Sequence, residues 1–140
     1  MKPVMQTKFG DGKGDCFAAC VASILEVPLG NLPNFCVDFP SDTWFADSNE
    51  WLLRYCGVGL HDFRCEEPFP WISLYGEFGP YYIVSGTSPR GLMHACVGRD
   101  GKVVHDPHPD GGGLLDIDSY TVFVAMQPER WRDAFRTDGQ

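Results

Sequence analysis

The order of two sequence patterns along the chain constrains the fold most, because helical spacing comes first and strand-like runs come last. Apolar residues at helical spacing predict a helix over 16–27, with Asp15 at its N-cap and Pro28 at its end. A second helix is predicted over 43–56, with Gly57 as the residue that ends it. Strands are predicted over four runs rich in β-branched and aromatic residues: 81–85, 92–97, 102–105 and 120–126. This order predicts an α+β fold.

The length and composition predict one domain over residues 1–140. A chain of 140 residues that is 44% apolar can bury a sizeable core without disulfides or metals. A short turn of helix is expected over 32–35, whereas 58–79 shows no sustained period. No repeat or linker divides the chain. We therefore expect N-terminal helices packed on a C-terminal antiparallel sheet.

The charge of the chain argues against two classes of partner. Nineteen acidic residues face eleven Lys and Arg, which leaves a formal net charge of −8. Nucleic acids and anionic membranes are bound mainly through clustered Lys and Arg, so we expect neither as a partner. No run approaches the roughly 18 apolar residues of a membrane span, and the start has no apolar segment of a signal peptide. We expect a cytoplasmic protein.

Six cysteines are many for a chain of this length, and their spacing argues against a common zinc site. None is in a C-x-x-C pair, and no two pairs repeat at the spacing of a zinc site. In a cytoplasmic protein the thiols are reduced, so a disulfide framework is not expected. Cys20 lies one turn after Cys16 on the apolar stripe of the first helix, and core packing is its expected role.

Cys16 has the sequence context of a nucleophile. It lies in the first turn of the predicted helix, directly after a loop that contains Gly10, Gly12 and Gly14. Unpaired backbone N–H groups and the helix dipole stabilise a thiolate at such a position, so we expect a lowered pKa. The same N–H groups can donate to an oxyanion beside the sulfur. A cysteine at a helix start is more often a small packing residue, so a catalytic role requires a base.

His94 is the candidate base, and a predicted hairpin brings Asp106 towards it. Asp100-Gly101 between two apolar runs is typical of a hairpin turn. A two-residue turn would place Asp106 on the face opposite His94. A three-residue loop over 99–101, with Gly101 as a bulge, pairs residue 94 with residue 106 instead. We favour the second register, in which Asp106 orients the imidazole.

Three motifs carry a resemblance to the papain-like cysteine peptidases. Gly-Asp-Cys-Phe-Ala-Ala-Cys at 14–20 resembles the start of their central helix. His-Ala-Cys-Val-Gly at 94–98 is similar to their His-Ala-x-x-Gly strand, and Asp-Pro at 106–107 is similar to that of the bacteriocin-processing branch. The order Cys, His, Asp and the order of helices and sheet also match. The whole chain also resembles small proteins encoded in phage and bacterial genomes, which implies that the expected cytoplasm is that of a bacterial cell or a phage-infected host.

The resemblance implies roles for four residues. Cys16 would be the nucleophile, His94 the general base and acid, Asp106 the residue that orients it, and Gln6 the side chain of the oxyanion hole. Gln6 precedes Cys16 by ten residues, farther than in the family, so the Gly-rich loop must fold back for its amide to reach. Phe17 replaces the small or Trp residue that commonly follows the nucleophile.

Other polar residues around these motifs have less specific expectations. Arg90, just before the strand of the candidate base, is the candidate for holding a substrate carboxylate, although it can equally be a solvated surface residue. His105 should face away from Asp106 on an alternating strand, which suggests a structural role. His105, Asp106, His108 and Asp110 would be the donors of a metal site, but no ligand spacing supports one. We expect neither a metal nor a cofactor.

These features together predict a cysteine hydrolase that cleaves an amide or isopeptide bond of a peptide or protein through a thioester intermediate. The same residues also serve acyl transfer, so a transglutaminase-like or acyltransferase activity is the nearest alternative. A non-catalytic binding or inhibitory module with the same fold, and a zinc-binding interaction domain, are alternatives of other classes.

Overall fold

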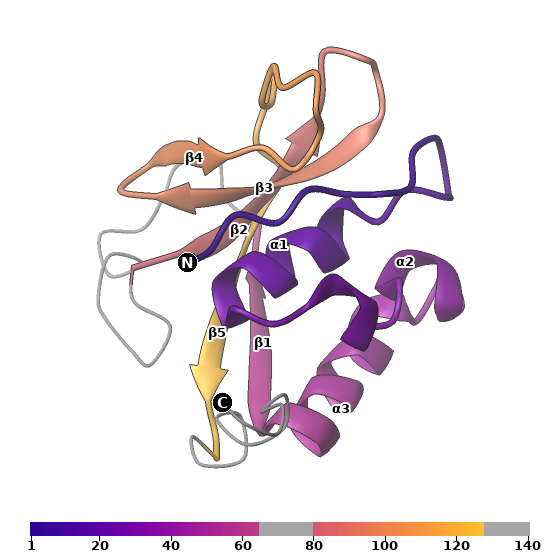
Figure 1. Cartoon of the computed structure of the whole chain (residues 1–140), viewed down its shortest axis with the longest axis vertical. Coiled ribbons are helices and arrows are strands. Elements are labelled where there is room, and N and C mark those ends of the chain that lie inside the picture. The colour runs from indigo at the N-terminus through magenta and orange to yellow at the C-terminus, as the bar shows by residue number, and fades with distance from the viewer. Residues whose placement is uncertain (65–79, 128–140) are drawn as a thin grey trace.

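The computed structural model describes residues 1–64 and 80–127, which form an α+β arrangement of N-terminal helices and a C-terminal antiparallel sheet (Figure 1). Three α-helices and one short 3-10 helix lie in the first part of the described chain. Their bounds are α1 Cys16–Leu25, η1 Leu29–Asn31, α2 Phe35–Asp38 and α3 Trp44–Cys56. The strands are β1 Val58–Phe63, β2 Tyr82–Thr87, β3 Met93–Arg99, β4 Lys102–His105 and β5 Ser119–Ala125. The predicted α+β class is confirmed.

Helix α1 is the centre of the main core. Nearly every one of its residues is buried, as expected for a helix covered on all sides. It ends two residues earlier than predicted, because Glu26 adopts a left-handed conformation with φ 59° and its N–H binds the carbonyl of Ala22. The Glu26 carboxylate also binds the N-terminal ammonium at 2.9 Å, so the start of the chain is tied to the end of α1.

The segment after α1 differs from the prediction in one respect, and α3 agrees with it closely. The single turn of helix expected over 32–35 is wrong: η1 ends at Asn31, before this range, and α2 begins at its last residue, Phe35. Helix α3 ends at Gly57, whose φ of 69° lies in the left-handed region that glycine adopts without strain, as predicted. Strand β1 follows at once, in the stretch 58–79 where no periodicity predicts an element. The rest of that stretch, from residue 65, lies outside the described residues.

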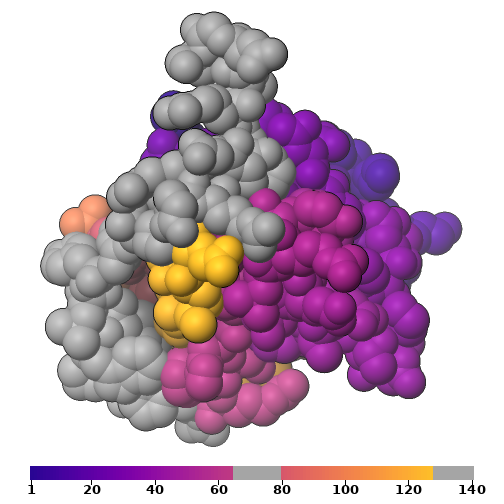
Figure 2. All heavy atoms as spheres, turned by 90° about the horizontal axis from the view of Figure 1, so that it is seen from below, coloured from indigo at the N-terminus to yellow at the C-terminus, as the bar shows by residue number. Residues whose placement is uncertain are grey.

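The sheet is antiparallel, with the strand order β1-β5-β2-β3-β4. All four predicted strands are present with small shifts at their ends, and β1 adds a fifth at the edge. Strand β1 pairs with β5 over its whole length, from Val58 opposite Ala125 to Phe63 opposite Tyr120. Figure 2 shows the yellow end of β5 beside the magenta surface of α3 and β1. Strand β5, the last strand of the described chain, therefore links β1, which directly follows α3, to the rest of the sheet.

The turn between β3 and β4 differs from the predicted one. Arg99 pairs with Lys102, so Asp100 and Gly101 form a two-residue turn. Both have positive φ, 53° and 77°, which is the conformation of a type I′ hairpin turn. The predicted three-residue loop with a bulge at Gly101 is therefore wrong, because the Asp-Gly pair satisfies the tighter turn.

A bulge farther along the hairpin nevertheless places Asp106 on the same face of the sheet as His94, as the predicted register would have done. The ladder shifts by one position between Val97 and Gly98, and Val104 is left without a partner. Without this bulge the alternation of β4 would put the side chain of Asp106 on the face opposite His94. The extra residue reverses the alternation, so Asp106 comes to the side of His94.

The two faces of the sheet are covered by different parts of the chain. Ile83, Ala95 and Val97 belong to the core that α1 completes. The opposite face has a smaller core around Tyr82, Val84, Cys96 and Tyr120, against which the loop after β4 packs Leu114 and Ile117. The strand that carries His94 therefore lies between α1 on one face and this loop on the other.

Gly86 allows the loop after β4 to approach the sheet, and its replacement tests that packing. A Cβ at Gly86 would meet the backbone carbonyl of Asp116, whose carbon lies at 2.9 Å and which cannot turn away as a side chain can. We expect Gly86→Ala to lower the free energy of unfolding by about 1–3 kcal/mol in denaturant titrations. Gly30→Ala is the matched control, since nothing lies within 4 Å of its Cβ position. Equal stability of the two variants would contradict this packing.

Candidate active site

Cys16 is the first residue of α1, and its half-buried side chain lies beside the strand of His94. The backbone N–H of Ala95, the residue after His94, lies near enough to the sulfur to lower its pKa. Burial of the thiol raises the pKa of Cys16 above its ordinary value, although backbone N–H groups including that of Ala95 act in the opposite direction. The expected lowered pKa is therefore wrong: loss of hydration outweighs the helix N-terminus.

His94 and Asp106 are in direct contact. His94 Nε2 lies 2.7 Å from Asp106 Oδ1, and only 5% and 11% of the two side chains are exposed. The carboxylate also accepts hydrogen bonds at 2.9 Å from the backbone N–H groups of His108 and Gly113. Burial alone would raise the pKa of Asp106, but these hydrogen bonds outweigh it and lower the pKa below the ordinary value. Asp106 is therefore a fixed, ionised acceptor.

The contact determines which nitrogen of His94 can act as a base. Burial lowers the pKa of His94 below its ordinary value, more than the neighbouring Asp106 raises it. The ring is therefore neutral near pH 7, and it donates its one N–H from Nε2 to the ionised Asp106. Nδ1 is left with the lone pair. At rest the pair consists of a protonated Cys16 thiol and a neutral imidazole.

The N-terminal segment folds back over α1 and brings Gln6 to the site. Figure 1 shows this indigo segment passing between α1 and the β3–β4 hairpin. The backbone N–H of Gln6 binds the carbonyl of Pro107 at 3.0 Å, and His105 Nε2 lies 2.8 Å from the carbonyl oxygen of Val4. Gln6 is 7% exposed, and its Nε2 donates to the carbonyl of Lys8 at 2.9 Å. The expectation that His105 has a structural role is consistent with this contact.

Asp15 holds this segment in place. It occupies the N-cap position of α1 but makes no side-chain hydrogen bond to the helix. Its carboxylate accepts instead from the backbone N–H groups of Thr7 and Lys8, both at 2.9 Å, and from the Thr7 hydroxyl at 2.8 Å. The sequence predicted the N-cap position of Asp15 but not its hydrogen bonds with Thr7 and Lys8. The Gly-rich loop is thereby closed at its base, one residue before Cys16.

Two cavities meet at Cys16 and His94. The larger, about 410 Å³, lies between the helices and the sheet, and its described lining includes Phe17, Trp44, Phe45, Asp62, Asp118 and Thr121. The smaller, about 210 Å³, lies on the side of the N-terminal segment, and its described lining includes Gln6, Phe9, Ser88, Arg90 and His108. Both cavities are lined by Cys16 and His94, so the thiol and the imidazole lie between them.

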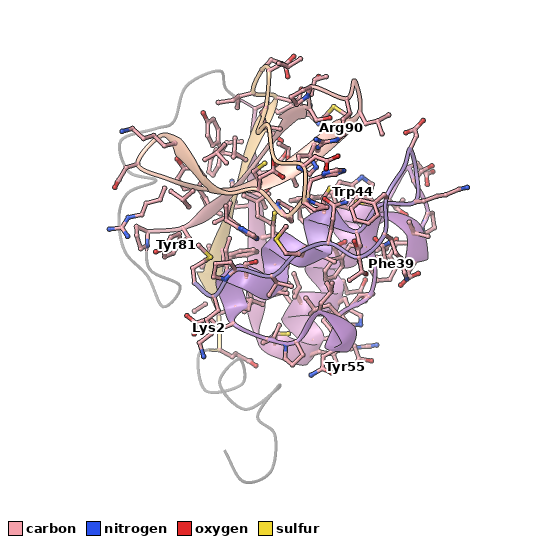
Figure 3. The ribbon with its side chains drawn as sticks, turned by 45° about the horizontal axis from the view of Figure 1, so that its top comes forward. Lys2, Phe39, Trp44, Tyr55, Tyr81 and Arg90 are labelled. Carbon is pink, nitrogen blue, oxygen red and sulfur yellow. The ribbon has the colours of Figure 1, made fainter. Side chains whose placement is uncertain are left out.

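Arg90 is exposed at the rim of the smaller cavity. Its Nη1 donates to the carbonyl of Gly111 at 3.0 Å, which connects the loop before β3 to the loop after β4. Figure 3 shows Arg90 and Trp44 at one end of the molecule, away from Lys2 and Tyr55. The structure thus brings the five residues that the sequence singled out into one region: Gln6, Cys16, Arg90, His94 and Asp106.

Cys96 is fully buried and lies next to the His94–Asp106 pair, on the side of β3 that regular alternation predicts. Donor atoms of His94, Cys96 and Asp106 all lie within 4.8 Å of one another, a set that differs from the four donors considered in the sequence. Imidazole, thiol and carboxylate are the donors that zinc prefers, but here the imidazole and carboxylate are engaged with each other at 2.7 Å. The alternation of β3, which places Cys96 on the same side as His94, is the signal that indicates this proximity.

The other described cysteines are free thiols. No disulfide joins the five cysteines in the described part of the chain, and Cys20 is fully buried in the core, as predicted.

A scan against models of protein families finds no match, and searches of curated proteins and of solved structures return none at a significant level. Within residues 1–64 and 80–127, no helix alone has the length and apolar character of a membrane span, although one sharply bent helix pair passes this test when taken together.

The titration of His94 tests the contact with Asp106. Because the carboxylate raises the pKa of His94 against the effect of burial, Asp106→Asn should move the midpoint of the His94 titration to lower pH. The imidazole resonances followed by NMR as a function of pH give this midpoint directly. Asp110→Asn removes an exposed carboxylate from the same loop and should leave the midpoint unchanged. A rise of the midpoint in Asp106→Asn would contradict the assignment.

The role of Asp15 can be measured as stability. Asp15→Ala leaves the backbone N–H groups of Thr7 and Lys8 without their acceptor, so we expect the free energy of unfolding to fall by about 1.5–3 kcal/mol. Asp11→Ala, an exposed carboxylate in the Gly-rich loop, is the control and should change little. Denaturant titrations of the two variants make the comparison. If Asp15→Ala is as stable as the control, the carboxylate does not anchor the segment.

Proposed function

We propose that the protein is a papain-like cysteine hydrolase that cleaves an amide or isopeptide bond of a peptide or protein. The observation that carries the proposal is the position of Cys16 and His94 between two cavities, with Asp106 fixed against the far nitrogen of the imidazole. A nucleophile, a base and a group that orients the base are the parts that acyl transfer through sulfur requires. The helices-then-sheet arrangement and the three sequence motifs agree with this family.

The first half of the reaction starts from neutral partners. As the sulfur of Cys16 attacks the substrate carbonyl carbon, its proton passes to Nδ1 of His94, and the resulting imidazolium is stabilised by Asp106. The carbonyl π electrons move to oxygen and form a tetrahedral oxyanion. When the C–N bond breaks, the imidazolium gives the proton to the leaving amine. The acyl group remains on Cys16 as a thioester.

The second half of the reaction uses the same groups with water. His94 removes a proton from water as the water oxygen attacks the thioester carbon. The C–S bond then breaks, the product leaves as a carboxylic acid, and the proton returns from His94 to the sulfur. An amine in place of water would give acyl transfer, and the two outcomes are told apart by the mass of the product.

Backbone and side-chain N–H groups supply the candidate oxyanion hole. The first N–H groups of α1 have no partner within the helix, and those of Cys16 and Phe17 lower the pKa of the Cys16 thiol. Gln6 uses one N–H of its amide on the carbonyl of Lys8, which leaves the second N–H as a candidate donor on a residue that lines the smaller cavity together with Cys16. Fixed donors of this kind stabilise charge that develops on the carbonyl oxygen.

Trapping of the acyl-enzyme tests the proposal. A panel of electrophilic peptide and ubiquitin-like probes, such as vinyl sulfones, should label the wild-type protein at Cys16, as read by intact mass and peptide mapping. Cys16→Ala should not be labelled, and His94→Gln should react about 10²–10⁴-fold more slowly because the base is lost. Cys56→Ala, which removes a buried thiol remote from both cavities, is the control and should react like the wild type.

A different labelling pattern would exclude the proposal. Label on any other cysteine with the same rate in Cys16→Ala, or equal rates for the wild type and His94→Gln, would show that Cys16 is not an activated nucleophile. The non-catalytic binding module and the zinc-binding domain both predict that outcome.

A further inference from the structure

The smaller cavity contains buried polar groups that the fold leaves without partners. Gln6 Oε1 and Ser88 Oγ both belong to residues that line it, and neither has a hydrogen-bond partner among the described residues. Gln6 is 7% exposed and Ser88 is 1% exposed. A buried oxygen without a partner costs free energy, so two such oxygens on residues that line one cavity favour a ligand that supplies the missing hydrogen bonds.

The donors around this cavity suit an anion. Arg90 brings a permanent positive charge, and it is the one residue of the described lining that does. His108 Nδ1 accepts a hydrogen bond from the backbone N–H of Asp110 at 3.0 Å, so a neutral His108 ring carries its hydrogen on Nε2 and can donate. The Ser88 hydroxyl can donate as well.

The larger cavity on the other side of Cys16 has the opposite character. Its described lining includes two carboxylates, Asp62 and Asp118, and one cation, Arg64, which is paired with Asp118 at 3.1 Å. The described lining of the smaller cavity contains Arg90 and no Asp or Glu. This contrast occurs in a chain with a net charge of −8, so the positive side of the site is a local feature and not the general character of the surface.

We propose that the smaller cavity binds the C-terminal residue of a peptide through its free α-carboxylate, so that the protein removes single residues from peptide C-termini. The inference rests on the proposed function, since it assigns the substrate of the same site. Arg90, His108 and Ser88 would bind the carboxylate, and Gln6 Oε1 would accept from the N–H of the terminal residue. Arg90 is a guanidinium, whose fork geometry matches a carboxylate.

The direction of the substrate follows from the chemistry of a peptide. A free α-carboxylate exists only on the last residue, and that residue is on the leaving side of any bond cleaved before it. A cavity that binds this group next to the thiol is therefore the site of the leaving group. Its volume of about 210 Å³ is below the roughly 300–1,000 Å³ of cavities that enclose drug-sized ligands, which suits one residue.

The step is the one described above with a defined leaving group. The bond between the last two residues breaks, its nitrogen receives the proton from His94, and a free amino acid departs from the smaller cavity. The shortened peptide stays on Cys16 as a thioester until water releases it with a new C-terminal carboxylate.

Two pools of short peptides with random sequence, one with free C-terminal carboxylates and one with C-terminal amides, test the proposal. We expect the wild type to remove one residue from the free acids, read by mass spectrometry, with kcat/KM about tenfold or more above that for the amides, because a charge-assisted hydrogen bond is lost. Arg90→Gln should remove this preference, mainly through a higher KM for the free acids. Arg54→Gln, a substitution in the last turn of α3, is the control and should keep it.

Each other result would overturn the inference, and the labelling of Cys16 separates its failure from that of the proposed function. Equal cleavage of acids and amides, or cleavage in the middle of the peptides, would overturn the C-terminal specificity while the hydrolase assignment holds. A preference that is unchanged in Arg90→Gln would remove the carboxylate site. Absence of cleavage from both pools would also overturn the inference, and the probe result at Cys16 would then decide whether the nucleophile is active on other substrates.

Discussion

The contact between His94 and Asp106 is the interaction on which the candidate site depends, and a single extra residue in the β3–β4 hairpin makes it possible. A type I′ turn at Asp100-Gly101 fixes the start of the ladder and, continued regularly, would put Asp106 on the wrong face. The bulge shifts the side-chain alternation of the strand by one residue, which puts Asp106 on the face of His94. Backbone N–H groups of the following loop then donate hydrogen bonds to the Asp106 carboxylate. The tight turn and the correct face are therefore obtained independently, each by a local feature of the backbone.

Three distant segments of the chain are brought together around this contact by packing and by backbone hydrogen bonds. The burial of every α1 residue after Cys16 fixes the position of Cys16 at the first turn, since a helix in the centre of a core has no freedom to rotate. The N-terminal segment is held at one end by the Asp15 carboxylate and at the other by the carbonyl of Pro107, next to Asp106. Gln6 provides the N–H that binds Pro107, and the two residues bound by Asp15, Thr7 and Lys8, follow it directly. The segment thus positions a side chain that the α1 helix and the sheet alone would not supply.

Much of this arrangement could be predicted from the sequence where the signal is local. The two longer helices and the four predicted strands follow from periodicity and from Asp15, Pro28 and Gly57. The sequence also predicts a hairpin that brings Asp106 to His94, but with a three-residue loop, whereas the observed two-residue turn brings them together only through the bulge. Three features could not be predicted. Strand β1 is an edge strand specified by its pairing with β5, far along the chain. The bulge depends on the packing of the two faces. The raised pKa of Cys16 depends on how deeply the thiol is buried, which no sequence pattern states.

The raised pKa of Cys16 and the lowered pKa of His94 have a common cause and a common consequence. Burial disfavours the charged form of both groups, so the resting pair is neutral and the thiol is a weak nucleophile until its proton is transferred. In the proposed reaction charge appears only during attack, when the oxyanion meets the N–H groups of α1 and the imidazolium meets Asp106. Preorganised groups of this kind act on the transition state and not on the resting protein. Burial therefore keeps the free Cys16 thiol a weak nucleophile. In the proposed reaction, Cys16 becomes a strong nucleophile only when a substrate occupies the cavities on either side of it.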